Sequence, residues 1–519
     1  MELHTVKVAP SRGTVLVPYE KSVSNLIPHS KIVRLHNERH VEVPHGREEV
    51  QLLRNLGYTV PAPILHHYDW PGLQTPFTTQ KKTAAMLTMQ RRAFVLNQFG
   101  TGKTRATLFA ADFLQRRGDI NKILIIAPLS TLNPVWYSEC FQLFNHLNPV
   151  VLHGTRARRL KLLNSDEFDT FIINHDGIGI IVEAMLERTD INCVILDELT
   201  AFRNARTDRF KFMRKIVQGR DFIWGLTGAP TPNEPTDAWA QCRLVNPDRV
   251  SRNFRDFRDE TMLKVSQFKW VGRPNANDTV FNAMQPAVCY TRAESYTAKK
   301  PTYSPIEPEL SKQQKKFYNA MRTNLAVQYK NHEITAANEG VKMGKLLQVC
   351  CGYVYDNDRN VLGLSPGPRL EAIDEVIQES DAKVIVFVPF IHAVQQVEAW
   401  LSKKYSTALI YGDIKKKARD QIFNSFQKAD DPHVLVAHPK TMSHGLTLTA
   451  ASTIVWYSPT TSLETYIQAN ARFLRESQKY VPAIVHVEST EVEKRLYKRL
   501  KNRQSTQGVL LEMFEEASL

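Results

Sequence analysis

A stretch suited to binding phosphate groups lies early in the chain. It reads "NQFGTGKTRAT" over residues 97–107, between the apolar runs "AFVL" and "LFAADFL". Its glycines let the backbone turn tightly, so that successive N–H groups and the start of a helix face an anion. A lysine and a threonine follow, which suit the β- and γ-phosphates and Mg²⁺ respectively. The predicted phosphate-binding residues are Gly100, Thr101, Gly102, Lys103 and Thr104. The pattern is not complete, because Asn97 stands where the phosphate-loop consensus has its first glycine.

Two acidic residues end an apolar run about ninety residues further on. Asp197 and Glu198 follow "NCVIL", which reads as a buried strand. At the carboxyl end of such a strand both side chains would reach the crevice where α/β sheets bind ligands. We predict that Asp197 binds Mg²⁺ and that Glu198 orients and deprotonates the attacking water. Acids at strand ends are common, so the prediction depends on the phosphate-binding stretch upstream.

A third group of polar residues lies near the carboxyl end of the chain. Gln468, Arg472 and Arg475, in "TYIQANARFLRESQ", have the i, i+4, i+7 spacing of one helical face. A solvated basic face is the plain alternative. If a second domain closes on the nucleotide, these guanidinium groups would act as arginine fingers, worth roughly 10³–10⁵ in rate.

The elements that must position these residues are short apolar strands separated by helices. Such alternation indicates parallel sheets covered on both faces, and it occurs twice, so the predicted class is α/β with two tandem lobes. Residues 1–70 instead alternate apolar and polar positions and read as a small β-rich module. The predicted divisions are an accessory domain (1–70), a first lobe (71–249), a connector or insertion (250–310), a second lobe (311–500) and a helical tail (501–519).

Composition limits the partners of the chain. Its 519 residues carry a formal net charge of +14, which favours a polyanion, and nucleic acid is the usual one. No apolar run approaches the ~20 residues needed to cross a bilayer, so we expect no membrane partner. The six cysteines form no C-x-x-C pair, and no secretory signal is visible, so we expect reduced thiols and a cytoplasmic location.

Taken in order, these motifs resemble those of superfamily 2 helicases and translocases, specifically their Swi/Snf-like branch. The likeness covers roughly residues 75–500. It implies two RecA-like lobes, ATP and Mg²⁺ as cofactors, and a glutamine upstream of the phosphate loop that reads adenine. The segments that carry it are Gln80 in "PFTTQ", "FGTGKT" (motif I), "LIIAPLSTLNPVW" (Ia), "VILDELTAFRN" (DExx box), "GLTGAPTPN" (III), "GLTLTAASTIVWYSP" from Gly445 (V) and "QANARFLRESQ" (VI).

Two positions depart from the family pattern. Thr200 replaces the histidine that often follows the acidic pair and couples hydrolysis to motif III. Ala471 replaces the acid of motif VI. The resemblance still implies that Gly445 contributes to nucleotide binding, and that Gln468, Arg472 and Arg475 complete the catalytic site when the second lobe closes.

The function expected from the resemblance is an ATP-dependent motor, expected to be a monomer, that tracks on duplex or branched DNA. Residues 1–70 resemble the modules of annealing and fork-remodelling helicases, which implies fork regression, annealing or branch migration in replication, recombination or repair. Replication or recombination proteins are further candidate partners. Three alternatives stay open: an RNA-directed helicase, a remodeller that displaces proteins from DNA, and a DNA-binding module with an inactive NTPase. A bacterial or phage-infected cytoplasm, or a nucleus in a eukaryote, is the expected location.

Overall fold

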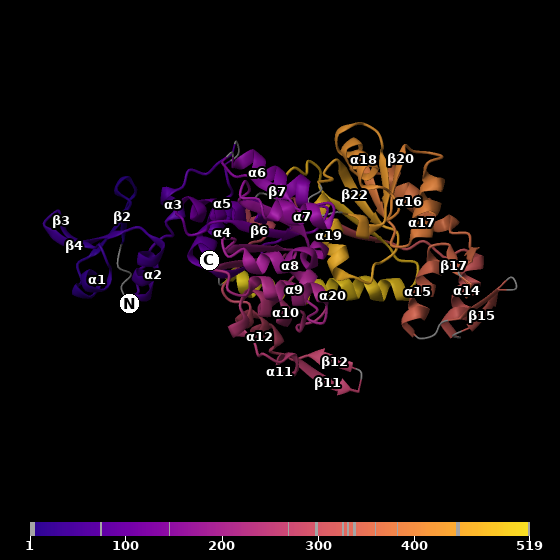
Figure 1. Cartoon of the computed structure of the whole chain (residues 1–519). Helices are drawn as coiled ribbons and strands as arrows, with labels where there is room; N and C mark the ends of the chain where they lie inside the picture. The colour runs from indigo at the N-terminus through magenta and orange to yellow at the C-terminus, as the bar shows by residue number, and fades with distance from the viewer. Residues whose placement is uncertain are drawn as a thin grey trace. The chain divides into compact units, whose positions relative to one another are not determined.

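The computed structural model describes residues 6–516 except 73–74, 145, 268, 296–298, 324–325, 330–331, 336–338, 359, 381 and 443–446. The chain divides into two compact units, Met1–Ser295 with Val509–Leu519, and Tyr296–Gly508. Each unit is built around its own parallel sheet (Figure 1). No helix in the described part of the chain is both long enough and apolar enough to cross a membrane.

The first unit begins with the predicted β-rich module. Its antiparallel sheet has the strand order β1-β2-β4-β3. The strands are β1 (Lys7–Ala9), β2 (Thr14–Pro18), β3 (Lys31–Leu35) and β4 (Glu38–Pro44), and the helices are α1 (Lys21–Leu26) and α2 (Arg47–Asn55). Val15 and Val17 both enter the hydrophobic core, as the period of two in a strand requires.

The main sheet of the first unit has seven parallel strands in the order β13-β5-β10-β9-β6-β8-β7. These are β5 (Arg92–Val95), β6 (Ile123–Ala127), β7 (Pro149–Val151), β8 (Thr170–Asn174), β9 (Cys193–Asp197), β10 (Phe222–Leu226) and β13 (Ala287–Val288). The main helices around them are α4 (Thr78–Met89), α5 (Lys103–Arg116), α6 (Ser138–Leu143), α7 (Arg156–Leu163), α8 (Ile178–Glu187), α9 (Asp208–Val217) and α10 (Asp237–Val245).

Alternate residues of these strands enter two different cores. Ile123 and Ile125 pack in the cluster that includes α4 and α5, whereas Leu124 and Ile126 pack in the cluster that includes α8, α9 and α10. The sheet is therefore covered on both faces, which is why its strands are apolar throughout.

Residues 250–310, the predicted connector or insertion, contain regular helices and strands. Here α11 (Phe254–Thr261), β11 (Met262–Ser266), β12 (Lys269–Gly272) and α12 (Ala276–Ala283) precede β13. The segment predicted as a connector or insertion therefore contributes a strand to the first sheet, since β13 pairs with β5. Further along, β14 (Thr302–Ile306) pairs with β23 of the second sheet.

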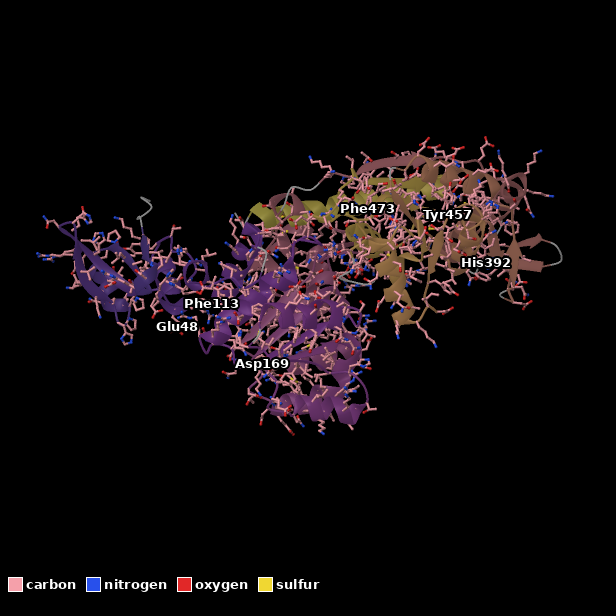
Figure 2. All side chains as sticks on the ribbon, turned by 90° about the horizontal axis from the view of Figure 1, so that it is seen from above. Glu48, Phe113, Asp169, His392, Tyr457 and Phe473 are labelled. Carbon is pink, nitrogen blue, oxygen red and sulfur yellow. The ribbon has the colours of Figure 1, made fainter. Side chains whose placement is uncertain are left out.

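The sheet of the second unit has six parallel strands in the order β14-β23-β22-β19-β21-β20. These are β14, β19 (Lys383–Phe387), β20 (Thr407–Ile410), β21 (Val434–Ala437), β22 (Ala451–Trp456) and β23 (Ala483–Val487). The main helices are α14 (Lys312–Thr323), α15 (Glu339–Cys350), α16 (Gly367–Gln378), α17 (Ile391–Leu401), α18 (Lys416–Lys428), α19 (Leu463–Phe473) and the part of α20 (Glu491–Glu516) that precedes Val509. Tyr457 and Phe473, labelled in Figure 2, belong to two different core clusters of this unit. The predicted class, two RecA-like α/β lobes after a small antiparallel module, is confirmed.

Candidate active site

Three loops with predicted chemistry leave neighbouring strands at the same edge of the first sheet. The phosphate loop follows β5, the acidic pair ends β9, and "TGAPTPN" follows β10. Strand β10 pairs in parallel with both β5 and β9. Since the carboxyl ends of parallel strands meet at one edge, the sheet brings the three loops together, as α/β ligand sites require.

The phosphate loop has the backbone form that its glycines allow. Gly100 and Gly102 have φ angles of 91° and 78°, in the left-handed region. A Cβ atom on Gly102 would lie 2.1 Å from Nε2 of Gln80. The helix α5 begins directly afterwards at Lys103, so its N-terminal N–H groups face the loop. The loop therefore suits the close approach of an anion.

Gln80 joins the helix α4 to this loop. Its Oε1 accepts a hydrogen bond from the backbone N–H of Phe77 (2.9 Å), and its Nε2 donates to the carbonyl oxygen of Gly102 (3.4 Å). The side chain is almost fully buried. Its predicted contact with adenine stays a prediction.

Lys103 lies over the loop that precedes it. Its Nζ donates to the carbonyl oxygen of Asn97 (2.8 Å) and lies 4.7 Å from the centre of the Phe99 ring. A Cβ atom on Gly228 would lie 2.8 Å from the same ring. The loop after β10 thus packs directly against Phe99, which also contacts Lys103. This contact links motif III to motif I.

Asn97 has a structural task at the position where a glycine was expected. It is 2 % exposed. Its Nδ2 donates to Oγ1 of Thr83 on α4 (2.9 Å), and its Oδ1 accepts from the N–H of Tyr290 after β13 (3.1 Å). The Asn97 side chain therefore links the start of the phosphate loop to α4 and to the segment after β13.

Asp197 is held by neighbours on both oxygens of its carboxylate. The indole N–H of Trp136 donates to Oδ2 (2.9 Å), and the backbone N–H of Glu198 donates to Oδ1 (3.0 Å). Nε2 of His175 lies 2.9 Å from the backbone oxygen of Asp197. Sequence reasoning missed the roles of Trp136 and His175, although they end the segments "LNPVW" and "TFIINH".

Glu198 differs from its neighbours in backbone conformation. Glu198 has φ 49° and ψ 57°, which is unusual for a residue other than glycine and is frequent at functional sites. Thr200 is buried, and its carbonyl oxygen accepts from the backbone N–H of Arg203 (3.2 Å). The position that carries histidine in the family pattern is therefore a core position here.

In the second unit, one predicted arginine lies on a helix and the other lies beyond its end. Gln468 and Arg472 lie on α19, and Nε2 of Gln468 donates to Glu464 (3.3 Å). The expectation of one continuous helical face is wrong for Arg475, because α19 ends at Phe473 and Leu474 leaves helical geometry. Arg472 is 3 % exposed, so it does not lie on a solvated basic face. Gly445 lies outside the described residues.

Motifs V and VI are joined by hydrogen bonds to backbone oxygens. The N–H of Leu448 donates to the carbonyl oxygen of Arg472 (2.9 Å). Gln478 donates to the carbonyl oxygens of Ala451 (3.1 Å) and Phe473 (3.2 Å). Ala471, which replaces the acid of motif VI, is 3 % exposed. Motif VI therefore contributes buried residues to the hydrophobic core that also contains residues of β22.

Two family models match the chain. The "SNF2-related domain" matches residues 79–353, which is more than half of the chain, and the "Helicase conserved C-terminal domain" matches residues 368–477. Together they span the motifs described above almost completely.

Curated proteins from a phage, a bacterium and a mammal are among those similar to the chain. "Putative protein p41" of Acyrthosiphon pisum secondary endosymbiont phage 1 is 24% identical, over 81% of this chain and 95% of p41. An "Uncharacterized ATP-dependent helicase" of Mycoplasma genitalium is 24% identical over 70% of this chain, and "Chromodomain-helicase-DNA-binding protein 9" of Mus musculus is 23% identical over 83%. The matched region spans about a third of the mycoplasma protein (34%) and a smaller part of the mouse protein (15%).

Proposed function

The chain belongs to the SNF2-related family and is an ATP-hydrolysing enzyme of the helicase class, and from this premise we propose that it is a translocase on duplex or branched DNA. The observation that carries the proposal is the sheet edge where β5, β10 and β9 present the phosphate loop, motif III and the acidic pair side by side. The DNA would be the track along which ATP hydrolysis drives the motor.

The residues at this edge fit a nucleotide with Mg²⁺. The left-handed glycines and the start of α5 would hold the phosphates together with Lys103. The Thr104 hydroxyl and the Asp197 carboxylate would hold Mg²⁺, which offsets negative charge on the phosphates. Glu198 would take the proton of the attacking water.

The second unit would complete the site by its arginines. Arg472 and Arg475 are the proposed fingers, with Gln468 as a further member of the motif, and Gly445 and Gln80 are proposed nucleotide contacts. Closure and release of the lobes would couple each hydrolysis event to movement along the track.

Several features favour DNA as the track. The chain carries a formal net charge of +14, and a similar mouse protein is named as a DNA-binding helicase. Contacts to phosphates would make binding independent of sequence and sensitive to salt. Fork regression, strand annealing or branch migration are the specific activities that we propose. The phage relative p41 favours a phage-infected bacterial cytoplasm as the setting.

The test is the ATPase rate with duplex DNA, a model fork, single-stranded DNA and RNA. We expect duplex and forked DNA to stimulate hydrolysis most. Stimulation by RNA alone would contradict the proposal and favour an RNA-directed helicase. Stimulation by duplex DNA without any fork regression, annealing or branch migration would retain the translocase and favour displacement of bound proteins instead.

A further inference from the structure

A helix and a two-stranded ribbon project from the first unit, apart from its parallel sheet (Figure 1). The helix α11 leads directly into β11, whose one partner among the described strands is β12. In this antiparallel register Lys264 faces Trp270, and Leu263 faces Val271. An isolated two-stranded ribbon is marginally stable in water. Since packing against the parallel sheet does not account for this exposed ribbon, we considered whether it binds a partner.

The ribbon is basic and lacks acidic residues. Between positions 261 and 273 the sequence contains Lys264, Lys269 and Arg273 and no Asp or Glu. All three cations are exposed, as is Arg255 on α11. Within the described part of the chain, Arg255, Lys264 and Lys269 form no ion pair, so their charges are available to a partner.

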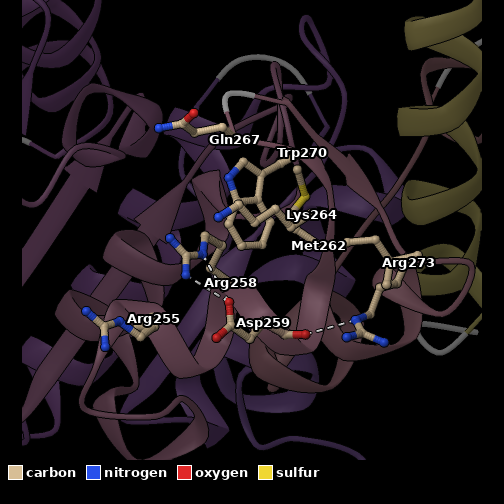
Figure 3. Close-up of a pocket in the computed structure, with 9 residues that line it drawn as sticks. Arg255, Arg258, Asp259, Met262, Lys264, Gln267, Trp270 and Arg273 are labelled. Atoms are coloured by element: carbon tan, nitrogen blue, oxygen red, sulfur yellow. Dashed lines mark hydrogen bonds and ion pairs between the residues drawn. The ribbon is translucent and has the colours of Figure 1, made fainter.

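An open cavity of about 680 Å³ lies between α11 and the ribbon (Figure 3). The Arg258 guanidinium covers the Trp270 ring at 4.0 Å and pairs with Asp259 at 2.9 Å. Nε of Arg273 donates to the backbone oxygen of Asp259 (2.8 Å). These contacts fix the walls of the cavity. Arg255 and Lys264 also line it, and neither pairs with an acidic group among the described residues.

Apolar side chains lie beside these charges. Leu263, Val265 and Val271 are 40%, 60% and 37% exposed. A surface that combines unpaired cations with apolar groups suits nucleic acid, since the cations can contact phosphates and the apolar groups can pack on sugars and bases. A two-stranded ribbon also has the width that the major groove of DNA admits.

We propose that α11 and the β11–β12 ribbon form an additional DNA-binding element, which contacts the sugar–phosphate backbone through Arg255, Lys264 and Lys269. The proposal rests on the function proposed above, because it supplies a second contact for the same DNA. The ribbon itself has no acidic residue, whereas α11 carries Asp256, Asp259 and Glu260. The lysines of the ribbon would therefore provide most of the attraction to phosphates, because burying them against an uncharged protein surface would leave their charges uncompensated.

The first test is the salt dependence of binding to a short duplex DNA. We compare the wild-type protein with the double variant Lys264→Ala/Lys269→Ala. Each phosphate contact contributes about 0.9 to the slope of log K against log salt, so the double variant should lose about 1.8. The matched control, Lys403→Ala/Lys428→Ala, removes two exposed cations from the second unit and should keep the wild-type slope.

The outcomes separate the two proposals. A double variant with the slope and affinity of the wild type would overturn the ribbon proposal while leaving the translocase intact. Failure of the wild-type protein to bind DNA at all would instead contradict the proposed function. Equal unfolding temperatures for wild type and variant would establish that any loss of binding is local.

A second measurement uses the wild-type protein and needs no variant. Acetylation of exposed lysines is followed by mass spectrometry with and without the duplex. We expect DNA to protect Lys264 and Lys269 and to leave Lys403 and Lys428 reactive. Equal reactivity of the two ribbon lysines in both conditions would overturn the proposal and direct attention to a protein partner for this surface.

Discussion

At the scale of single residues, the proposed roles assign nucleotide binding and hydrolysis to different side chains. Lys103 would contribute positive charge to binding, whereas Glu198 would act on the attacking water. Glu198→Gln should therefore retain ATP binding and lower turnover by about 10²–10⁴-fold, the usual worth of a general base. Lys103→Ala should abolish hydrolysis through lost phosphate contact. ATP binding and steady-state turnover are measured together, and near-normal turnover in Glu198→Gln would refute its assignment as the base.

Gly102 offers a second prediction, which separates backbone strain from local crowding. Gly102→Ala would strain a left-handed residue and place a methyl group against Gln80. Gly118 has a similar φ of 80°, and no atom lies within 4 Å of the place that a Cβ would take, so Gly118→Ala is the matched control. Both variants should lose about 1–2 kcal/mol of stability. Only Gly102→Ala should raise the KM for ATP; equal KM values would show that the contact with Gln80 is unimportant.

Trp136 should act as a positioning residue for Asp197. Trp136→Phe keeps an aromatic ring in the core but removes the N–H that holds Oδ2 of the carboxylate. Loss of such an orienting partner typically weakens metal affinity about 10–100-fold. We expect a matching rise in the Mg²⁺ concentration needed for half-maximal ATPase. Trp224→Phe is the control, since Trp224 is equally buried but donates to the backbone oxygen of Gln90. An unchanged Mg²⁺ requirement in Trp136→Phe would refute the role.

At the scale of elements, a buried ion pair joins α16 to α20 in the second unit. Arg369 pairs with Glu493 at 2.7 Å, and both side chains are almost fully buried. Nη1 of Arg369 also donates to the carbonyl oxygen of Tyr457 after β22 (2.7 Å). Removing one member leaves a buried charge uncompensated, so Glu493→Gln should destabilise the unit by about 3–5 kcal/mol.

The control for this pair is an exposed one on the same helix. Lys494 pairs with Glu307, and their side chains are 36% and 57% exposed. Glu307→Gln should cost about 0–1 kcal/mol, as surface pairs do. Urea unfolding measures the free energy of unfolding of both variants. Equal losses of stability would mean that burial of the Arg369–Glu493 pair does not determine its contribution.

The elements also show where sequence reasoning succeeds. The run "NCVIL" predicted β9, because a strand buried on both faces must be apolar throughout. Residues 287–288 and 302–306 gave no such signal. These short strands lie at the edges of their sheets. An edge strand pairs with one strand only and is less buried, so it needs fewer apolar residues. The end of α19 was missed because its helical spacing continues in the sequence past Phe473, while the backbone turns at Leu474.

The site itself was predictable only in part. The phosphate loop and the acidic pair are local patterns, and the sheet topology then places them at one edge. Trp136 and His175 could not be assigned in this way, since each meets Asp197 from a different segment across the sheet. Such contacts depend on strand order, which the sequence does not state.

At the scale of the whole molecule, the boundary between the accessory module and the first lobe bears on how the module can be tested. The sequence predicts an accessory domain over residues 1–70, but Tyr68 contacts the lobe. Its hydroxyl donates to Oδ2 of Asp112 on α5 (2.6 Å), and its ring packs edge-on against Phe113 (5.8 Å between centroids). Just before it, His67 lies 2.8 Å from His45 at the end of β4, and burial lowers the pKa of His45 to about 4. The segment 58–70 therefore contacts both parts.

A truncation that removes residues 1–70 should accordingly damage the lobe as well as the module. We expect it to be less stable than a truncation of residues 1–57 by about 3–5 kcal/mol, the usual cost of deleting a large buried aromatic side chain. The shorter truncation carrying Tyr68→Phe keeps the ring and loses only the bond to Asp112, so it should fall between the two. Thermal unfolding measures all three proteins. If the two truncations unfold at the same temperature, the segment 58–70 belongs to the module, and deletion at residue 70 is a clean test of DNA-fork specificity.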